Sequence, residues 1–384
     1  MISAIQSFSF NRPAYTYQQP QFKGKAKALY AGSFDPITKG HMDIIKSASE
    51  MFDKLVVLIA KNPAKKGFLP VEDRAKLIKE AVEEINLNNV TVDIAPNDLL
   101  TVDYAKANGA SVLVRGLRTV TDFDSEMQLA EINKKLNRDV RTVFLTSNSE
   151  YSAISSSAVR GILACHGNIT EFVPNSVTKY LSLKDKWDSL KDKFGIQADF
   201  TKISRNYNAK ERKYHDLNHV YNVIKHIEDF NRNNPYVIED IDELIVSAFL
   251  HDICLGPDDI KMSIEKAKSL FKDGCPEQII KNIQATDHSK LLSKEASVSE
   301  KVLADADLAI LGTIPENYKK YSKQIREEYS QYSNEEYAKG RTEVLRNFLL
   351  RDRIFQTDYF YMKYESNACQ NIGSEINQLK LSQL

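Results

Sequence analysis

The stretch YAGSFDPITKGHMDIIKSA at residues 30–48 joins a short apolar segment to an amphipathic run through a glycine-rich turn. The apolar segment, 27–31, has the length of a strand, and the apolar spacing of 36–52 is that of a helix. A strand, a glycine turn and a helix in this order are typical of a βαβ unit. The stretch therefore predicts the first crossover of a parallel α/β sheet.

The same alternation continues to about residue 183. Apolar or alternating segments predict strands at 54–60, 90–95, 111–116 and 141–147, and helical spacing lies between them at 70–86, 101–108 and 121–137. Such alternation implies a parallel sheet with helices on both faces. We therefore expect an α/β Rossmann-like domain over 27–183.

The remainder of the chain has helical spacing and no convincing strand or tandem repeat. A chain of 384 residues is long for one core, so two domains are expected. We predict a disordered tail at 1–26, which lacks the features of a signal peptide, a charged linker helix at 184–199 and an all-α HD-type domain at 200–384. Helices are expected at 216–233, 240–252, 259–272, 276–286, 297–311, 315–332 and 334–350, and in the final stretch.

Charge and cysteine content exclude several classes of protein. Lys+Arg and Asp+Glu both number 52, so no bulk charge favours nucleic acid or a membrane surface. No apolar stretch approaches the length of a membrane span. The four cysteines are far apart in sequence, which favours reduced thiols over a disulfide framework or a zinc site. We expect a cytoplasmic protein that binds neither nucleic acid nor membranes.

The glycine turn has the residues of a phosphate site. Gly32 allows a close turn, Ser33 supplies a hydroxyl, and Gly40 permits close approach before His41, whose ring is able to donate to a phosphate oxygen. Ligands of such sheets bind at the carboxyl ends of the strands, and helix N-termini there favour phosphate. The stretch is not a P-loop, because no GxxxxGK[ST] occurs in it. The alternative is a plain turn with a helix-capping histidine.

Two further turns at predicted strand ends support the phosphate interpretation. RGLRTVTDFDSEMQLA at 115–130 brings Arg115 and Arg118 together after a buried strand, although a solvated arginine pair would look the same. YSAISSSAVRG at 151–161 is a hydroxyl-rich turn that enters a helix, where a serine N-cap is the simpler alternative. Three such turns along one sheet edge indicate a nucleotide crevice.

GSFDPITKGH resembles the T/HxGH signature of the nucleotidyltransferase superfamily. Together with NPAKK at 62–66 and the two turns above, it is similar to the bacterial phosphopantetheine adenylyltransferase family over residues 27–183. The resemblance implies adenylyl transfer from ATP to 4′-phosphopantetheine with Mg²⁺, giving dephospho-CoA and pyrophosphate. It also implies a homo-oligomer, since bacterial relatives form hexamers.

The resemblance also assigns roles to residues. In many family members Thr stands where this chain has Ser33, and Ser keeps the hydroxyl. The implied catalytic residues are His41, Lys65, Arg115 and Arg118, and the implied phosphopantetheine contacts are Ser33, Lys65, Leu100 and Arg115. The implied ATP contacts are Ser33, Phe34, His41, Gly116, Leu117, Arg118, Glu126, Tyr151, Ser152, Ala153, Ile154, Ser155, Ser156 and Ser157.

The implied chemistry needs no general base, because the attacking phosphate is already anionic at neutral pH. The catalytic task is to bring two polyanions together and to stabilise charge on the transferred phosphate. Another acceptor, such as nicotinate mononucleotide or glycerol phosphate, remains an alternative, as does cytidylyl transfer. Arg115 with Lys65 favours an acceptor that carries a phosphate.

The helical half gathers histidines and aspartates. His251 and Asp252 adjoin after an apolar run, His219 borders an apolar stripe, and Asp305 and Asp307 lie in an otherwise apolar helix. Polar groups in such places need partners. A mixed nitrogen and oxygen set of this kind suits a divalent metal such as Mn²⁺, Fe²⁺, Co²⁺ or Ni²⁺, which would generate hydroxide for attack on a phosphoester.

YHDLNH at 214–219, HDICL at 251–255, DADLAILG at 305–312 and GRTEVLRNFLLRDRIF at 340–355 resemble the HD phosphohydrolase superfamily, in a group of predicted metal-dependent enzymes. The resemblance covers about 200–380 and implies an all-helical hydrolase of a phosphorylated small molecule. Its implied metal ligands are His219, His251, Asp252 and either Asp305 or Asp307, with Asp307 favoured by its Ala and Leu neighbours. His215, His288, Arg341 and Arg353 are candidates for contact with substrate phosphate.

One departure from that group concerns the loop after the His-Asp pair. An Asn-Glu pair often follows there, whereas this chain reads Asp259-Ile260. The missing acidic residue would serve as a general base, so metal binding is less affected than catalysis. The alternative is a non-catalytic binding or regulatory module.

Overall fold

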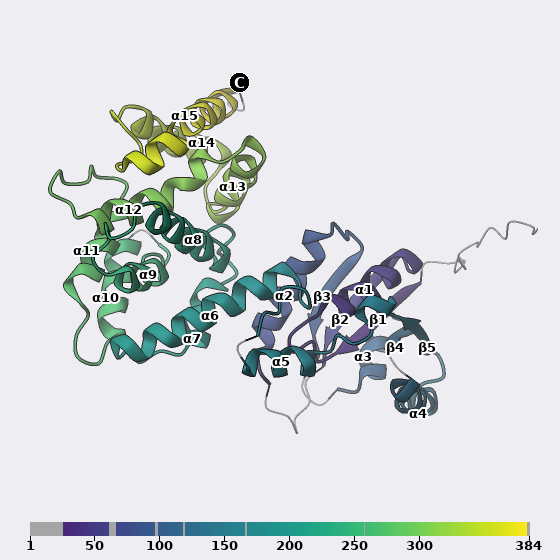
Figure 1. Cartoon of the computed structure of the whole chain (residues 1–384). Coiled ribbons are helices and arrows are strands. Elements are labelled where there is room, and N and C mark those ends of the chain that lie inside the picture. The colour runs from purple at the N-terminus through teal and green to yellow at the C-terminus, as the bar shows by residue number, and fades with distance from the viewer. Residues whose placement is uncertain are drawn as a thin grey trace, which may run out of the picture. The chain divides into compact units, whose positions relative to one another are not determined.

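A computed structural model describes residues 26–60, 67–96, 99–117, 120–165, 167–256 and 258–381 (Figure 1). The chain divides into two compact units, Met1–Pro174 and Asn175–Leu384. Apart from its last residue, the expected tail at 1–26 lies outside the described residues, as do two expected site residues, Lys65 and Arg118. None of the described helices is long and apolar enough to span a membrane.

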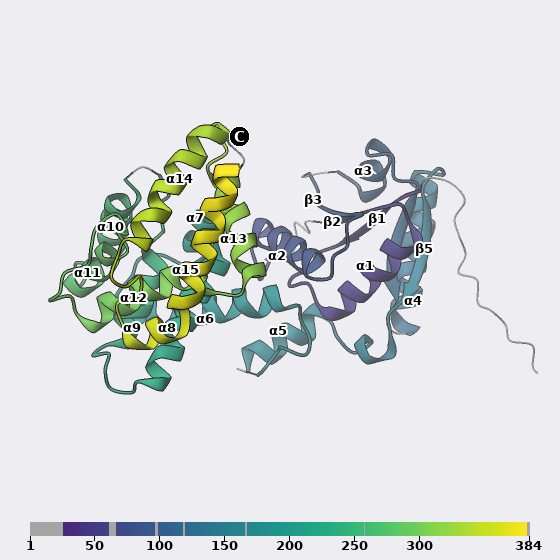
Figure 2. The same ribbon diagram turned by 90° about the horizontal axis from the view of Figure 1, so that it is seen from above.

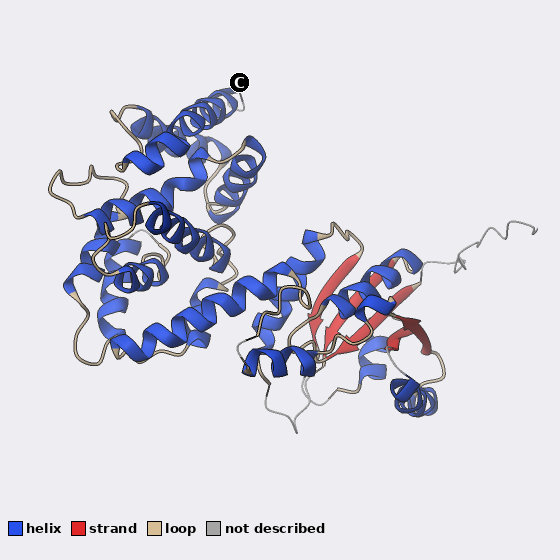
Figure 3. Cartoon of the chain, viewed as in Figure 1, coloured by secondary structure: helices blue, strands red, loops and turns tan. Residues whose placement is uncertain are grey.

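The first unit contains the expected parallel sheet (Figure 3). Its strands lie in the order β3-β2-β1-β4-β5. β2 and β3 therefore follow β1 on one side, and β4 and β5 follow it on the other. The strand order thus reverses between β1 and β4. Ligands bind at the carboxyl ends of strands at such a reversal. The strands are β1 (Lys27–Gly32), β2 (Lys54–Ile59), β3 (Val90–Ile94), β4 (Val112–Leu117) and β5 (Arg141–Thr146).

Both faces of the sheet are covered, which explains why β2 is apolar along nearly all of its length. Leu29, Val56 and Leu113 belong to one buried cluster together with Val102 of α3. Tyr30, on the other face of β1, is also buried. Figure 2 shows α1 and α3 on opposite sides of the sheet. The helical elements of this unit are α1 (Lys39–Met51), α2 (Val71–Glu84), α3 (Thr101–Ala107), α4 (Val120–Leu136), η1 (Ser149–Tyr151) and α5 (Ser156–Ala164).

The second unit is helical, as expected, apart from an isolated bridge between Ile196 and Phe271. Its first helix, α6, is continuous over Asn175–Phe194 and includes much of the expected linker. Trp187 of α6 is fully buried, donates to the Ala198 carbonyl at 2.8 Å and packs edge-on against Phe249. The tryptophan therefore fixes α6 to the second unit.

The remaining helices follow the expected spacing closely. Among the described residues of this unit, the sequence-based prediction missed the start of α6 and all of α7 (Phe200–Tyr207), a short helix whose residues Phe200, Ile203, Ser204 and Tyr207 are buried at helical spacing. The other elements are α8 (Leu217–Asn233), α9 (Ile241–Leu250), α10 (Asp259–Leu270), α11 (Glu277–Ala285), α12 (Val298–Leu308), η2 (Ala309–Gly312), α13 (Pro315–Glu328), α14 (Asn334–Leu349) and α15 (Asp358–Leu381).

Candidate functional sites

The glycine turn after β1 is tightly packed. A Cβ on Gly32 would lie 2.9 Å from the ring of Phe34, so a larger residue would displace that ring. Phe34 is buried and has a φ of 46°, a left-handed conformation that non-glycine residues seldom adopt. Its ring meets Tyr30 and His41 edge-on, with centroids 5.3 Å and 5.2 Å apart. The turn thus fixes the place of the His41 ring.

His41 is also part of the N-terminal cap of α1. The Thr38 backbone N–H donates to His41 Nδ1 at 3.1 Å, and the His41 N–H donates to Thr38 Oγ1 at 3.4 Å. Because a backbone N–H always donates, Nδ1 must be an acceptor, and a neutral ring carries its proton on Nε2. The helix-capping alternative and the donor role are therefore compatible, since each uses a different ring nitrogen.

Two side chains anchor the turn: Asp35 from within it and Arg74 from α2. The Asp35 carboxylate accepts from the N–H groups of Phe68 and Leu69 at 2.7 Å and 2.9 Å. Arg74 donates to the Ser33 carbonyl at 2.9 Å. The Ser33 side chain remains exposed. Sequence reasoning did not single out Asp35 or Arg74, because their partners lie more than 30 residues away.

The hydroxyl-rich segment 151–157 packs on the same turn. Ser155 caps α5 by accepting from Ala158 N–H at 3.0 Å, and Ser156 donates to the Pro36 carbonyl at 2.8 Å. A Cβ on Gly40 would lie 3.3 Å from the Tyr151 carbonyl oxygen, so glycine permits this close approach. Ser152, Ala153 and Ile154 lie between these contacts, in the loop that follows η1.

Arg160 joins the two segments and was not identified from the sequence, although it lies within the hydroxyl-rich stretch 151–161. Its guanidinium donates to the Asp35 carbonyl at 2.6 Å and to Ser157 Oγ at 3.1 Å. The spacing of three residues between Ser157 and Arg160 on a helix was the available signal.

The end of β4 lies beside the turn that follows β1. Arg115 Nε lies 3.0 Å from the Glu126 carboxylate, and Nη1 donates to the Ala31 carbonyl at 3.3 Å. Arg115 and Glu126 are therefore paired rather than separately solvated. A Cβ on Gly116 would lie 3.1 Å from Ile44 of α1. Leu117 is the last residue of β4, and the exposed Leu100 precedes α3 at the same edge of the sheet.

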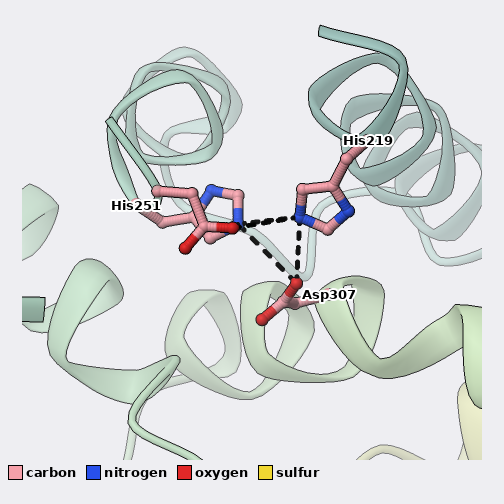
Figure 4. A group of neighbouring side chains, drawn as sticks. His219, His251 and Asp307 are labelled. Atoms are coloured by element: carbon pink, nitrogen blue, oxygen red, sulfur yellow. Dashed lines mark hydrogen bonds and ion pairs between the residues drawn. The ribbon is translucent and has the colours of Figure 1, made fainter. Parts of the chain in front are cut away.

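In the second unit, four of the five expected metal ligands converge. Ligand atoms of His219, His251, Asp252 and Asp307 all lie within 4.8 Å of one another, an arrangement that could hold a metal ion. They come from α8, from the end of α9 and from α12. Figure 4 shows the rings of His219 and His251 facing each other above the Asp307 carboxylate. We call these four residues the metal group.

The distances within the metal group are those of a chelating set. His219 Nε2 lies 3.1 Å from His251 Nε2, 3.4 Å from Asp252 Oδ2 and 3.1 Å from Asp307 Oδ1. His251 Nδ1 lies 3.0 Å from the Ala248 carbonyl, to which only a protonated nitrogen can donate. A neutral His251 therefore directs the lone pair of Nε2 toward His219, as a metal ligand does.

The four residues of the metal group shift one another's pKa values strongly, because both histidines are buried. Burial opposes protonation of His219, but hydrogen bonds to Asp252 and Asp307 raise its pKa to about 8. Burial also opposes ionisation of Asp307, but hydrogen bonds from the histidines hold its pKa well below the usual range. Without a cation, positive charge on the rings balances the carboxylates. A bound metal would take over that role.

Asp305 lies outside the metal group. Its carboxylate accepts from the N–H groups of Gln356 and Thr357 at 2.7 Å and 2.8 Å, and from the Thr357 hydroxyl. Burial raises the pKa of Asp305 to about 6. Asp307 instead points into the metal group and also contacts His288 Nε2 at 2.8 Å. The structure thus distinguishes two aspartates that the sequence left open.

His215 borders the metal group and is held by Glu328. The two side chains meet at 2.7 Å, and Glu328 also accepts from the N–H groups of Lys213, Tyr214 and His215. Burial alone would raise the pKa of Glu328, but these bonds lower it to about 2. The His215 ring lies 5.6 Å from that of His219. Glu328 was not found from the sequence, since it is 113 residues from His215.

Two arginines expected near substrate phosphate are neutralised within the protein. Arg341 Nε lies 3.0 Å from the buried Glu375 carboxylate, and Arg353 Nη1 lies 2.7 Å from Asp358. The Arg341 pair is buried, whereas the Arg353 pair is exposed at the surface. Asp259, part of the Asp259-Ile260 pair that departs from the resemblance, is the first residue of α10; it accepts from Ile260 N–H, and burial raises its pKa.

A family model described as cytidylyltransferase-like matches residues 29–162. "Phosphopantetheine adenylyltransferase" of Clostridium novyi (strain NT) is 45% identical over 152 residues, which are 40% of this chain and 92% of that protein. The protein of the same name from Thermotoga neapolitana is 47% identical over 159 residues, which are 41% of this chain and 96% of that protein. The family model thus lies within the first unit.

A solved structure, "Plasmodium falciparum nicotinic acid mononucleotide adenylyltransferase complexed with NaAD", aligns with 41% of this chain and 96% of its own at 18% identity, with a TM-score of 0.33. A likeness this low carries no argument about chemistry.

Proposed function

Because the chain belongs to the phosphopantetheine adenylyltransferase family through its first unit, we propose that this unit transfers the adenylyl group of ATP to 4′-phosphopantetheine. The products would be dephospho-CoA and pyrophosphate. The observation that carries the proposal is the convergence of the 32–41 turn and the 151–157 segment at the carboxyl end of β1, beside the end of β4.

The chain's residues support transfer by positioning and charge stabilisation. His41 Nε2–H would donate to a phosphate oxygen at the N-terminus of α1, where backbone N–H groups also favour an anion. Arg115 lies at the end of the adjacent strand, and its pairing with Glu126 would orient it for phosphopantetheine. Lys65 and Arg118 are further candidates from the resemblance.

Mg²⁺ would neutralise the ATP phosphates in this unit. Among the described residues of the first unit, no three His, Cys, Asp or Glu ligand atoms gather as in the metal group. The donor set therefore fits a cation bound chiefly by substrate phosphates and water, as Mg²⁺ commonly is.

The experiment for the first unit is a comparison of acceptors on the full-length chain. ATP and Mg²⁺ are supplied with 4′-phosphopantetheine, nicotinate mononucleotide or glycerol phosphate, and CTP replaces ATP in parallel reactions. We expect dephospho-CoA as the main product. Turnover with another acceptor, and none with 4′-phosphopantetheine, would contradict the proposal.

We propose for the second unit metal-dependent hydrolysis of a phosphorylated small molecule. The metal group supports it, because two imidazoles and two carboxylates suit Mn²⁺, Fe²⁺, Co²⁺ or Ni²⁺. A cation held there would supply Lewis acidity and an activated water for attack on phosphorus. His215, held by the ionised Glu328, would donate a proton to the departing oxygen.

Metal content and hydrolysis of p-nitrophenyl phosphate test this proposal on the full-length chain. His219→Ala should remove the bound metal and the activity. His226→Gln is the matched control, since His226 lies on the same helix, is half-buried and contacts Tyr364 instead of the metal group. Glu328→Gln should lower the rate about 10²-fold or more while metal stays bound.

A wild-type chain that binds metal but hydrolyses no phosphoester would favour the non-catalytic module instead. The absence of bound metal would contradict both the metal site and the hydrolase.

A further inference from the structure

Arg351 differs from Arg341 and Arg353, each of which forms an ion pair with a carboxylate. It is half-buried, and among the described residues no carboxylate lies within ion-pair distance of it. Its Nη2 donates to the His288 carbonyl at 2.5 Å, and its guanidinium covers the Phe348 ring, with 4.6 Å to the centroid. Burial lowers the pKa of Arg351, and no nearby anion offsets this effect. A partly desolvated cation without a counter-charge is costly, so the position favours an anion.

The residue that holds Arg351 also contacts the metal group. The His288 backbone accepts from Arg351, while His288 Nε2 lies 2.8 Å from Asp307 Oδ2. The other oxygen of Asp307 lies 3.1 Å from His219 Nε2. His288 therefore connects Arg351 to the metal group, since it accepts from Arg351 and contacts the ligand Asp307.

We propose that Arg351 binds a second phosphoryl group of the substrate whose first phosphoryl group is held at the metal group. The substrate class is then a compound with two linked phosphoryl groups, such as a diphosphate or a nucleoside polyphosphate. The planar guanidinium fork suits a phosphate with two hydrogen bonds. This inference rests on the metal-dependent hydrolase proposed for the second unit.

Anion titrations of the full-length chain loaded with Co²⁺ test the proposal. The visible spectrum of histidine-ligated Co²⁺ reports on the metal group, even though pyrophosphate also binds elsewhere. Pyrophosphate and orthophosphate are titrated separately against wild type, Arg351→Met and Arg353→Met. Arg353 is the matched control, because it is exposed and already paired with Asp358.

We expect Arg351→Met to raise the Kd for pyrophosphate about 10- to 100-fold, the range for loss of a charged hydrogen bond. Its Kd for orthophosphate should stay within about twofold, because a single phosphate occupies only the metal. Arg353→Met should change neither constant. Arg351→Lys should recover part of the pyrophosphate affinity by restoring the charge.

An unchanged pyrophosphate Kd in Arg351→Met would overturn the inference and leave the metal site intact. An equal loss for orthophosphate would also overturn it, because Arg351 would then act on the metal-bound phosphate or on the ligands. If the wild-type chain gives no cobalt spectrum, the proposed hydrolase fails and the inference fails with it.

Discussion

The two sites are assembled in different ways. The candidate nucleotide site of the first unit is built mainly from short segments at strand ends, and backbone groups make many of its contacts. The metal group of the second unit takes side chains from three regions that are far apart in sequence. A backbone cradle tolerates substitution at many positions, whereas a four-residue ligand set depends on each side chain. Changes to side chains should therefore affect the two units unequally.

His41→Ala is expected to have the largest effect in the first unit. Loss of one preorganised phosphate donor should lower the rate of dephospho-CoA formation about 10²–10³-fold. The metal content of the second unit serves as the control for folding and should not change. Retention of turnover within about tenfold of wild type would contradict the donor role of His41.

His288→Ala should have an intermediate effect on the second unit. His288 bonds to the far oxygen of Asp307, and outer partners of this kind typically contribute 10- to 100-fold in metal affinity. Competition with a chelator would measure the change. An unaltered metal affinity would show that the backbone alone positions Asp307.

The sequence predicted the segments of the candidate nucleotide site, because the signals were local. Strand ends, glycines and serines appear as short motifs, and parallel strands bring such motifs to one edge. The choice between Asp305 and Asp307 needed the structure. Their side chains lie two residues apart on a helix and so point in directions about 200° apart around its axis. Only one of the two aspartates therefore faces the metal group. The partnership of His215 and Glu328 had no local signal, since α8 and α13 meet only through tertiary packing.

The pH dependence should separate the metal-free and metal-loaded states. The pKa of His219 is raised to about 8 without a cation, so protons compete with metal below that pH. Metal affinity should then rise up to about tenfold per pH unit for this one proton until pH 8. Isothermal titration at several pH values would measure it. A flat profile between pH 6.5 and 8 would contradict the assignment.

The folding stability of the metal-free protein should fall with rising pH between about 6.5 and 8, where metal affinity rises. A folded pKa above the unfolded value of about 6.5 contributes stability that is fully present below pH 6.5. That contribution is lost as the pH rises through 8. Thermal unfolding would check this: with a chelator the Tm should fall as the pH rises from 6.5 to 8, whereas with bound metal it should rise.

Gly40→Ala should have the smallest effect. The new Cβ would lie 3.3 Å from the Tyr151 carbonyl, so the 151–157 segment must shift by a few tenths of an ångström. We expect the KM for ATP to rise roughly fivefold, with kcat less affected. Gly161→Ala, with open space around its Cβ, is the matched control and should behave as wild type.

The central claim is that one chain carries two separate phosphate chemistries. The full-length chain is given ATP, 4′-phosphopantetheine, Mg²⁺, Mn²⁺ and p-nitrophenyl phosphate in one sample, where chromatography measures dephospho-CoA and absorbance measures the p-nitrophenolate released. We predict that His41→Ala stops only dephospho-CoA formation and that His219→Ala stops only the release of phosphate from the ester. Loss of both activities in either variant, or survival of ester hydrolysis in His219→Ala, would contradict the account.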